Sequence, residues 1–174
     1  MNFYITSGTY EFLEKILNKY PQETMILMQN TQTSVLIHET QKKSVFGSPR
    51  KYEVISQSGE LENKGMVNLF NIPISDEGKP VFEFNFAKQI QSIKDAPGFI
   101  AYRFLKPKKG DTYILLTLWT DESYFKHWKG SNGYQTIIDS FPTENPLSSN
   151  QLFNGGAYET EYTIPSKENN NAPQ

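Results

Sequence analysis

Apolar residues in the first sixty positions follow first strand spacing and then helix spacing. A short apolar run over residues 3–6 indicates a strand, and apolar side chains then recur at helical spacing over residues 12–20. Pro21 ends that helix. Two β-rich runs follow between residues 25 and 38, and residues 52–55 fit either a strand or a short helix. The first half is therefore predicted to have the order β-α-β-β.

A polar, glycine-marked stretch at residues 58–65 separates this half from a longer pattern. Residues 81–86 alternate like a strand, but the wider spacing of apolar residues over 82–93 favours a helix. The predicted elements of the second half are a strand at 66–74, this helix, strands at 99–105 and 112–119, helices ending near 128 and covering 134–138, and a strand at 157–164. This β-α-β-β-α-β order is that of ferredoxin-like domains.

We predict an α+β fold in which antiparallel sheets form a barrel-like core. A ferredoxin-like domain covers residues 61–164 and is preceded by a smaller β-α-β-β region at residues 1–60. The polar tail at residues 165–174 is predicted to be disordered.

Charge and composition exclude several classes of protein and site. The net charge is −2 and the densest basic run, residues 106–109, reads as a hairpin turn, so the chain lacks the basic face of a nucleic-acid binder. With no cysteine, disulfides and thiolate sites are excluded. No apolar stretch reaches the roughly 18 residues of a membrane span, and the N-terminus has no signal-peptide pattern. We predict a cytoplasmic protein with no nucleic-acid or membrane partner.

Two histidines, His38 and His127, are the only ones in the chain, which excludes a histidine-rich metal site. His127 adjoins Trp128 on a predicted helix, where neighbours point about 100° apart, so His127 is expected to face solvent. His38 is expected on a hairpin surface. Aromatic residues make up 14% of the chain, which suits an aromatic core or, less commonly, a pocket for a flat ligand.

Several stretches of the chain resemble one family. They are Asn71–Ile74, Pro97–Phe99, Asp111–Trp119, Glu122–Phe125 and Trp128. In this order and spacing they resemble the antibiotic-biosynthesis-monooxygenase (ABM) domain, specifically its heme-degrading, Isd-type branch. Residues 8–13 and 37–40 resemble the extra N-terminal region of the two-part members of that branch, to which the family called target of an RNAIII-activating protein (TRAP) is related. The resemblance covers residues 1–164.

The resemblance implies a heme-degrading monooxygenase. Such an enzyme opens the porphyrin ring with O2 and an external electron donor, a reductase or ascorbate, and releases iron. Heme is then both the substrate and the group that activates O2, with no flavin and no other protein-bound metal. Single-domain relatives pair their sheets across a dimer interface, whereas here the N-terminal half could supply the second sheet, so we predict a monomer.

The resemblance also implies which residues act. It places the family's catalytic Asn and Trp at Asn71 and Trp128, and the family's iron-ligating His at Ile138, which cannot ligate iron. The metal ligand is therefore unknown. Tyr134 belongs to a residue type that ligates heme elsewhere, so Asn71, Trp128, Tyr134 and Ile138 are the candidate heme-contacting residues. From spacing alone, Trp128 and Tyr134 fit core positions, and Asn71 fits an edge-strand surface position or a buried one that needs hydrogen-bond partners.

Three alternatives stay open. The chain could bind heme or another flat molecule without oxidising it, could be a TRAP-like regulatory or stress protein with no cofactor, or could be a cofactor-free oxygenase of a polycyclic substrate. We favour heme degradation because two of the three family residues, Asn71 and Trp128, are present.

Overall fold

The computed structural model describes residues 1–141 and 156–166. Its strands are β1 (Asn2–Gly8), β2 (Thr24–Gln29), β3 (Ser34–Thr40), β4 (Arg50–Ser58), β5 (Met66–Pro73), β6 (Phe99–Pro107), β7 (Thr112–Trp119) and β8 (Tyr158–Thr163). Its helices are α1 (Tyr10–Lys19), α2 (Lys79–Gln89), the 3-10 helix η1 (Ile90–Asp95), α3 (Glu122–Lys129) and α4 (Asn132–Asp139). The predicted α+β class is confirmed.

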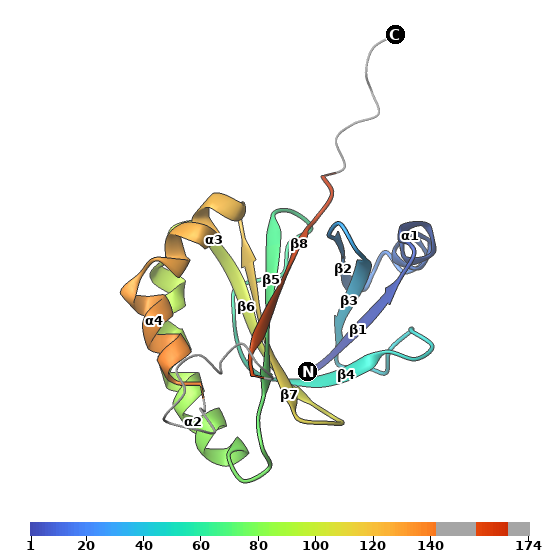
Figure 1. The fold of residues 1–174 in the computed structure, drawn as a ribbon. Coiled ribbons are helices and arrows are strands. Elements are labelled where there is room, and N and C mark those ends of the chain that lie inside the picture. The colour runs from blue at the N-terminus through green and yellow to red at the C-terminus, as the bar shows by residue number, and fades with distance from the viewer. Residues whose placement is uncertain (142–155, 167–174) are drawn as a thin grey trace.

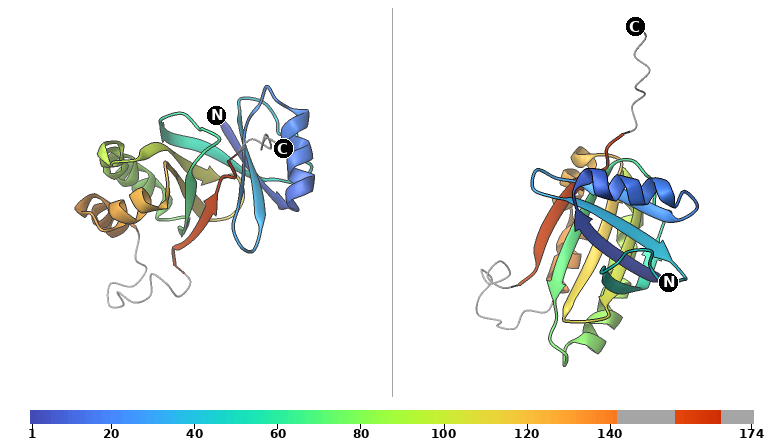
Figure 2. Two further views of the ribbon diagram at one scale, coloured as in Figure 1. Left: turned by 90° about the horizontal axis from the view of Figure 1, so that it is seen from above. Right: turned by 90° about the vertical axis from the view of Figure 1, so that its right-hand side faces the viewer.

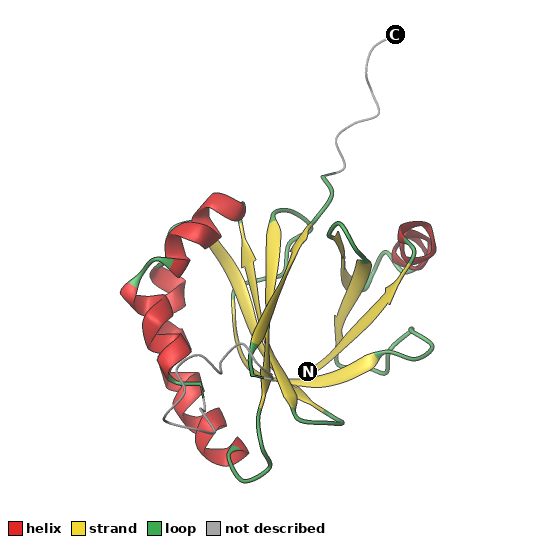
Figure 3. Ribbon diagram, viewed as in Figure 1, coloured by secondary structure: helices red, strands yellow, loops and turns green. Residues whose placement is uncertain are grey.

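The eight described strands form one closed ring in the order β1-β3-β2-β8-β5-β7-β6-β4. Every pairing in the ring is antiparallel. Strands β1 to β4 come from the first half of the chain and β5 to β8 from the second, and the halves join where β2 meets β8 and where β4 meets β6. Figure 3 shows the strands between helices on either side. The region 52–55 is thus part of a strand, because its backbone pairs with β1 and β6.

Helices cover the ring on two opposite sides (Figures 1 and 2). Helices α2, α3 and α4 lie together against the outer face of the β5–β7–β6 segment, while α1 lies alone against β1, β2 and β3. Residues 81–86 belong to α2, as the wider spacing predicted, because Phe82 and Phe86 both pack inward from one face of that helix.

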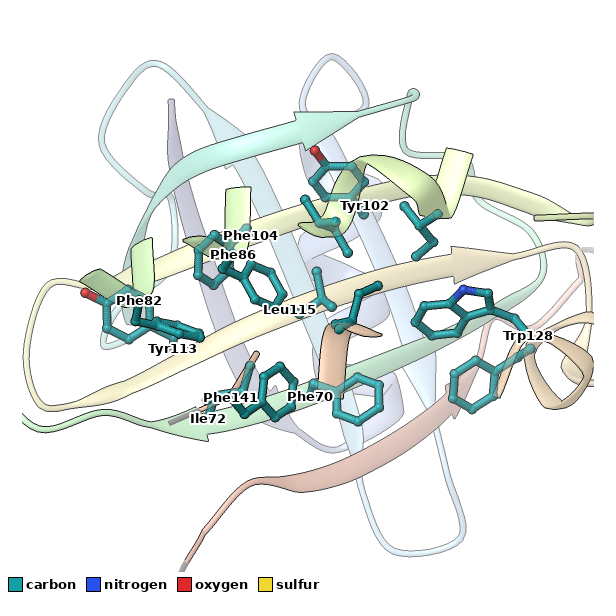
Figure 4. Packing of buried hydrophobic residues seen from close by; sticks show 14 of the residues in the cluster. Phe70, Ile72, Phe82, Phe86, Tyr102, Phe104, Tyr113, Leu115, Trp128 and Phe141 are labelled. Carbon is teal, nitrogen blue, oxygen red and sulfur yellow. The ribbon is translucent and has the colours of Figure 1, made fainter. Parts of the chain in front are cut away.

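The apolar side chains form three layers. One fills the inside of the ring, a second lies under α1, and the third lies between the sheet and α2–α4. The third layer contains most of the large aromatic residues (Figure 4): Phe70, Phe82, Phe86, Tyr102, Phe104, Tyr113, Trp119, Phe125, Trp128 and Phe141. The high aromatic content is therefore used mainly for packing the helices onto the sheet.

Two sequence expectations lie partly beyond what the structure describes. The predicted tail at 165–174 lies outside the described residues from position 167 onward. The division into residues 1–60 and 61–164 stays a prediction.

Among the described helices, none has the length and apolar character needed to cross a membrane.

Candidate functional site

A cavity of about 300 Å³ opens between the helices and the sheet, beside α3, α4 and β8. Its lining residues are Phe70, Lys129, Tyr134, Ile138, Phe141, Ala157, Tyr158 and Glu159. The volume is at the lower end of the roughly 300–1,000 Å³ typical of ligand sites. Two cavities of about 460 and 480 Å³ lie elsewhere, but neither is lined by a candidate residue from the sequence. This cavity, called the α4 pocket below, is therefore the candidate site.

Two of the four candidate residues, Tyr134 and Ile138, line the α4 pocket because they lie four residues apart on α4 and so share one face. Trp128 is 4% exposed and packs against Tyr134 with ring centroids 5.0 Å apart and planes at 78°. Trp128 also contacts Trp119 at 5.2 Å between centroids. Trp128 is thus a buried wall behind Tyr134, as its core spacing suggested.

Asn71 does not join them. In β5, Phe70 and Ile72 face the helices (Figure 4), and Asn71, which alternates with them, faces the inside of the ring. Asn71 is buried, and its Nδ2 donates to the carbonyl oxygens of Leu69 and Tyr158, both at 3.3 Å. The partners that a buried Asn requires are therefore backbone groups at one end of the ring.

The carboxylate of Glu159 is the common partner of the polar contacts in the α4 pocket. The Nζ of Lys129 lies 3.1 Å from Oε1 and 3.2 Å from Oε2 of Glu159. The hydroxyl of Tyr134 donates to Oε1 at 3.3 Å, and the Nδ2 of Asn68 donates to Oε2 at 3.1 Å. Four elements, β5, α3, α4 and β8, are joined at this single side chain.

The phenol of Tyr134 is held in its protonated form. Burial raises the pKa of Tyr134 above its ordinary value, and the charge of Glu159 together with the hydrogen bond to Glu159 raises it further. An iron-bound tyrosine is a phenolate, so ligation by Tyr134 would require breaking the contact with Glu159.

Neither histidine lines this pocket. His127 is exposed, as predicted. The surface position predicted for His38 is wrong: it is 1% exposed, and its Nε2 lies 2.8 Å from Oε2 of Glu23. The rings of Tyr4 and Phe46 pack on it. Strand alternation cannot show that Phe46, from the loop after β3, covers this face.

Within the described ranges, no cluster of three or more His, Asp or Glu side chains could hold a metal ion.

Sequence reasoning missed Asn68, Lys129 and Glu159. Asn68 carried a usable signal, since it is an amide inside an apolar strand just as Asn71 is. Lys129 and Glu159 carried none, because one is a charged residue at the end of a helix and the other sits in a polar strand. These three side chains meet because β5 pairs with β8 and because Lys129 at the end of α3 contacts Glu159 on β8.

The second half of the chain matches a known protein family. Residues 66–140 match the family described as Antibiotic biosynthesis monooxygenase, which confirms the resemblance seen in the sequence. This match spans β5 to α4, and therefore Lys129, Tyr134 and Ile138 of the α4 pocket.

Two relatives and one solved structure align with most of the chain. A protein of Listeria monocytogenes named heme-degrading monooxygenase is 25% identical over 162 residues, covering 93% of each chain. A protein of Staphylococcus aureus named signal transduction protein TRAP is 29% identical over 131 residues, covering 75% of this chain and 78% of its own. The structure of a major regulator of staphylococcal pathogenesis has a TM-score of 0.82 at 23% identity and covers 95% of this chain and all of its own, which shows a shared fold.

Proposed function

From the match of residues 66–140 to the antibiotic-biosynthesis-monooxygenase family, we propose that this chain binds heme and opens its ring with O2 and an external reductant, releasing iron. The α4 pocket carries the proposal, because it is lined by Ile138, where the resemblance leads us to expect a heme contact, and by Tyr134, whose residue type ligates heme in other proteins. The Listeria monocytogenes relative named heme-degrading monooxygenase supports heme as the substrate.

The chain's own part is to bind and shape the substrate. Bound heme supplies the iron at which O2 is activated, and electrons come from the external donor. Phe70, Ile138 and Phe141 offer apolar walls to a flat ring and keep water away from it. Tyr134, packed edge-to-face against the buried Trp128, makes one stiff side, and pressure from a stiff side is a means of distorting a macrocycle.

The pocket offers apolar surface to the porphyrin ring of heme, but its lining offers no ready ligand to the iron. Ile138 has no ligating atom, and Tyr134 is held as a phenol by Glu159. In our proposal the iron is therefore ligated by water or by another group. The resemblance also proposes Asn71 as a catalytic residue, but Asn71 lies on the face of β5 opposite the α4 pocket, so the geometry of this pocket does not support that role.

A titration of the purified protein with hemin tests the proposal. We expect a saturable shift of the hemin Soret band, followed by bleaching when ascorbate is added under air. No Soret shift in the wild-type protein would refute the proposal.

Two matched variants locate the site. Ile138→His returns an iron-ligating imidazole to the α4 pocket and should tighten hemin binding and change the Soret position. Gln135→His adds the same imidazole to the exposed face of the same helix and should leave both unchanged. Equal effects from the two variants would mean that hemin binds elsewhere on the protein.

The second candidate function is that of a non-catalytic heme binder or a TRAP-like regulatory protein. The absence of a histidine from position 138 favours it, as does the 29% identity to the Staphylococcus aureus TRAP protein. The same titration separates the candidates. A Soret shift without bleaching supports a binder, and no shift supports the regulatory function.

A further inference from the structure

The lining of the α4 pocket consists of an apolar set and a polar cluster. Phe70, Ile138, Phe141 and Ala157 are the apolar lining residues. Lys129, Glu159 and the Tyr134 hydroxyl contact one another and form the polar cluster. A molecule that fills such a pocket is apolar over most of its body and carries a polar group at one edge.

Lys129 is the one cation among the described lining residues of this pocket. Its side chain is 35% exposed, and its Nζ lies 5.4 Å from the centre of the Phe125 ring. An ammonium group has three N–H donors, and both polar contacts of Lys129 go to the one carboxylate of Glu159. Within the described part of the chain, at least one donor is therefore available to a ligand.

Buried contacts fix the position of this cation. Asn68 is fully buried, and its Nδ2 donates to Oε2 of Glu159. The Oδ1 of Asn68 has no hydrogen-bond partner among the described residues, and leaving a buried polar atom unpaired is costly. The Nδ2 of the same amide group holds the carboxylate of Glu159 in place. Because Glu159 holds Lys129, the long lysine side chain does not have to be ordered when a ligand arrives.

We propose that Lys129 is the specificity-determining residue of the α4 pocket and binds a carboxylate at the edge of a flat, apolar substrate. The inference rests on the proposed function and deepens it, because heme carries two carboxylates on one edge of its ring. A carboxylate placed beside Lys129 accepts a charge-assisted hydrogen bond while the ring lies against the apolar lining residues. Glu159 and Asn68 act as positioning residues for the lysine.

The test compares hemin with hemin dimethyl ester, which keeps the ring and the iron but has no carboxylate charge. Binding is measured by quenching of the fluorescence of the chain's two tryptophans, Trp119 and Trp128, so no turnover is needed. The wild-type protein should prefer hemin by about tenfold, the size expected of one charge-assisted contact. Lys129→Met should bind the ester as the wild type does and lose the preference.

Two further variants test whether the preference depends on the positive charge at position 129. Lys126→Met removes an exposed lysine from the same helix and should keep the full preference. Lys129→Arg keeps a charge in the pocket and should retain most of the preference even if Lys129→Met disturbs the fold. A preference that survives in Lys129→Met, or is lost in Lys129→Arg or Lys126→Met, would overturn the inference. If the wild type binds neither porphyrin, the proposed function itself fails, which is a distinct result.

Discussion

An ion pair inside the ring joins the two halves of the chain and allows a quantitative prediction. Arg103 on β6 and Glu39 on β3 are 5% and 10% exposed, and Nε of Arg103 lies 2.5 Å from Oε2 of Glu39. The Nη1 of Arg103 also donates to the carbonyl oxygens of Gly59 and Tyr102, both at 2.9 Å. The same Nη1 donates to the carbonyl oxygen of Ser58 at 3.3 Å. Removal of Arg103 therefore leaves a buried carboxylate and three carbonyl groups without this donor.

The expected loss is large. Breaking a buried pair by deleting one partner typically costs about 3–5 kcal/mol, against a total free energy of unfolding of about 5–15 kcal/mol. Arg103→Met should therefore lower the free energy of unfolding by about 3–5 kcal/mol. In the double variant Arg103→Met/Glu39→Leu no charge is left buried, so most of that loss should be recovered.

Urea denaturation followed by tryptophan fluorescence and far-UV circular dichroism measures both variants. The control is Lys64→Met, which removes one partner of an exposed pair with Glu62 and should cost less than about 1 kcal/mol. If Arg103→Met costs no more than this control, the pair is not a desolvated one and the reasoning is wrong. The two probes should also give one common transition, because the pair links β3 to β6. Separate transitions would instead support independent domains at residues 1–60 and 61–164.

Three further predictions concern single positions. Gly98 has φ +76°, and a Cβ there would lie 2.1 Å from Cγ of Tyr124, so Gly98→Ala should cost about 1–3 kcal/mol and lower the melting temperature. Asp121 caps α3 by accepting two backbone N–H bonds, so Asp121→Ala should cost about 1 kcal/mol in urea denaturation. Burial raises the pKa of Glu83, but the hydrogen bonds with Lys106 and Tyr113 and the charges of Lys106 and Lys79 together outweigh burial, so the net pKa is lowered. Glu83 thus stabilises the fold above its ordinary pKa of 4.5, and the wild type should lose more stability than Glu83→Gln as pH falls below that value.

Local patterns predicted most of the elements. The apolar spacing of residues 12–20 indicated α1, and Thr9 caps that helix by accepting from the N–H of Phe12. The pattern at residues 81–86 was ambiguous, because Val81 and Phe84 are apolar yet 65% and 64% exposed. Exposed apolar residues blur the helical period, so only the longer spacing gave the correct element.

The candidate site was predicted less completely, because it depends on which face of a strand meets the helices. Alternation places Asn68 and Asn71 on opposite faces of β5, but it does not say which face is covered by α3 and α4. Phe70 and Ile72 pack under the helices, which puts Asn68 on the pocket side and Asn71 inside the ring. The family resemblance concerned Asn71 alone, so the polar cluster around Glu159 was not anticipated.

The sequence by itself determined the class of fold, the order of the elements, the aromatic core and the resemblance to one family, because these follow from periodicity, turn residues and local motifs. The tertiary structure alone decided that the two halves close one ring, that His38 is buried and that Lys129, Tyr134 and Glu159 meet at one pocket. These contacts join residues far apart in the chain, such as Lys129 and Glu159 or Arg103 and Glu39. Spacing along a chain carries no information about such pairs, since they form only when separate elements pack together.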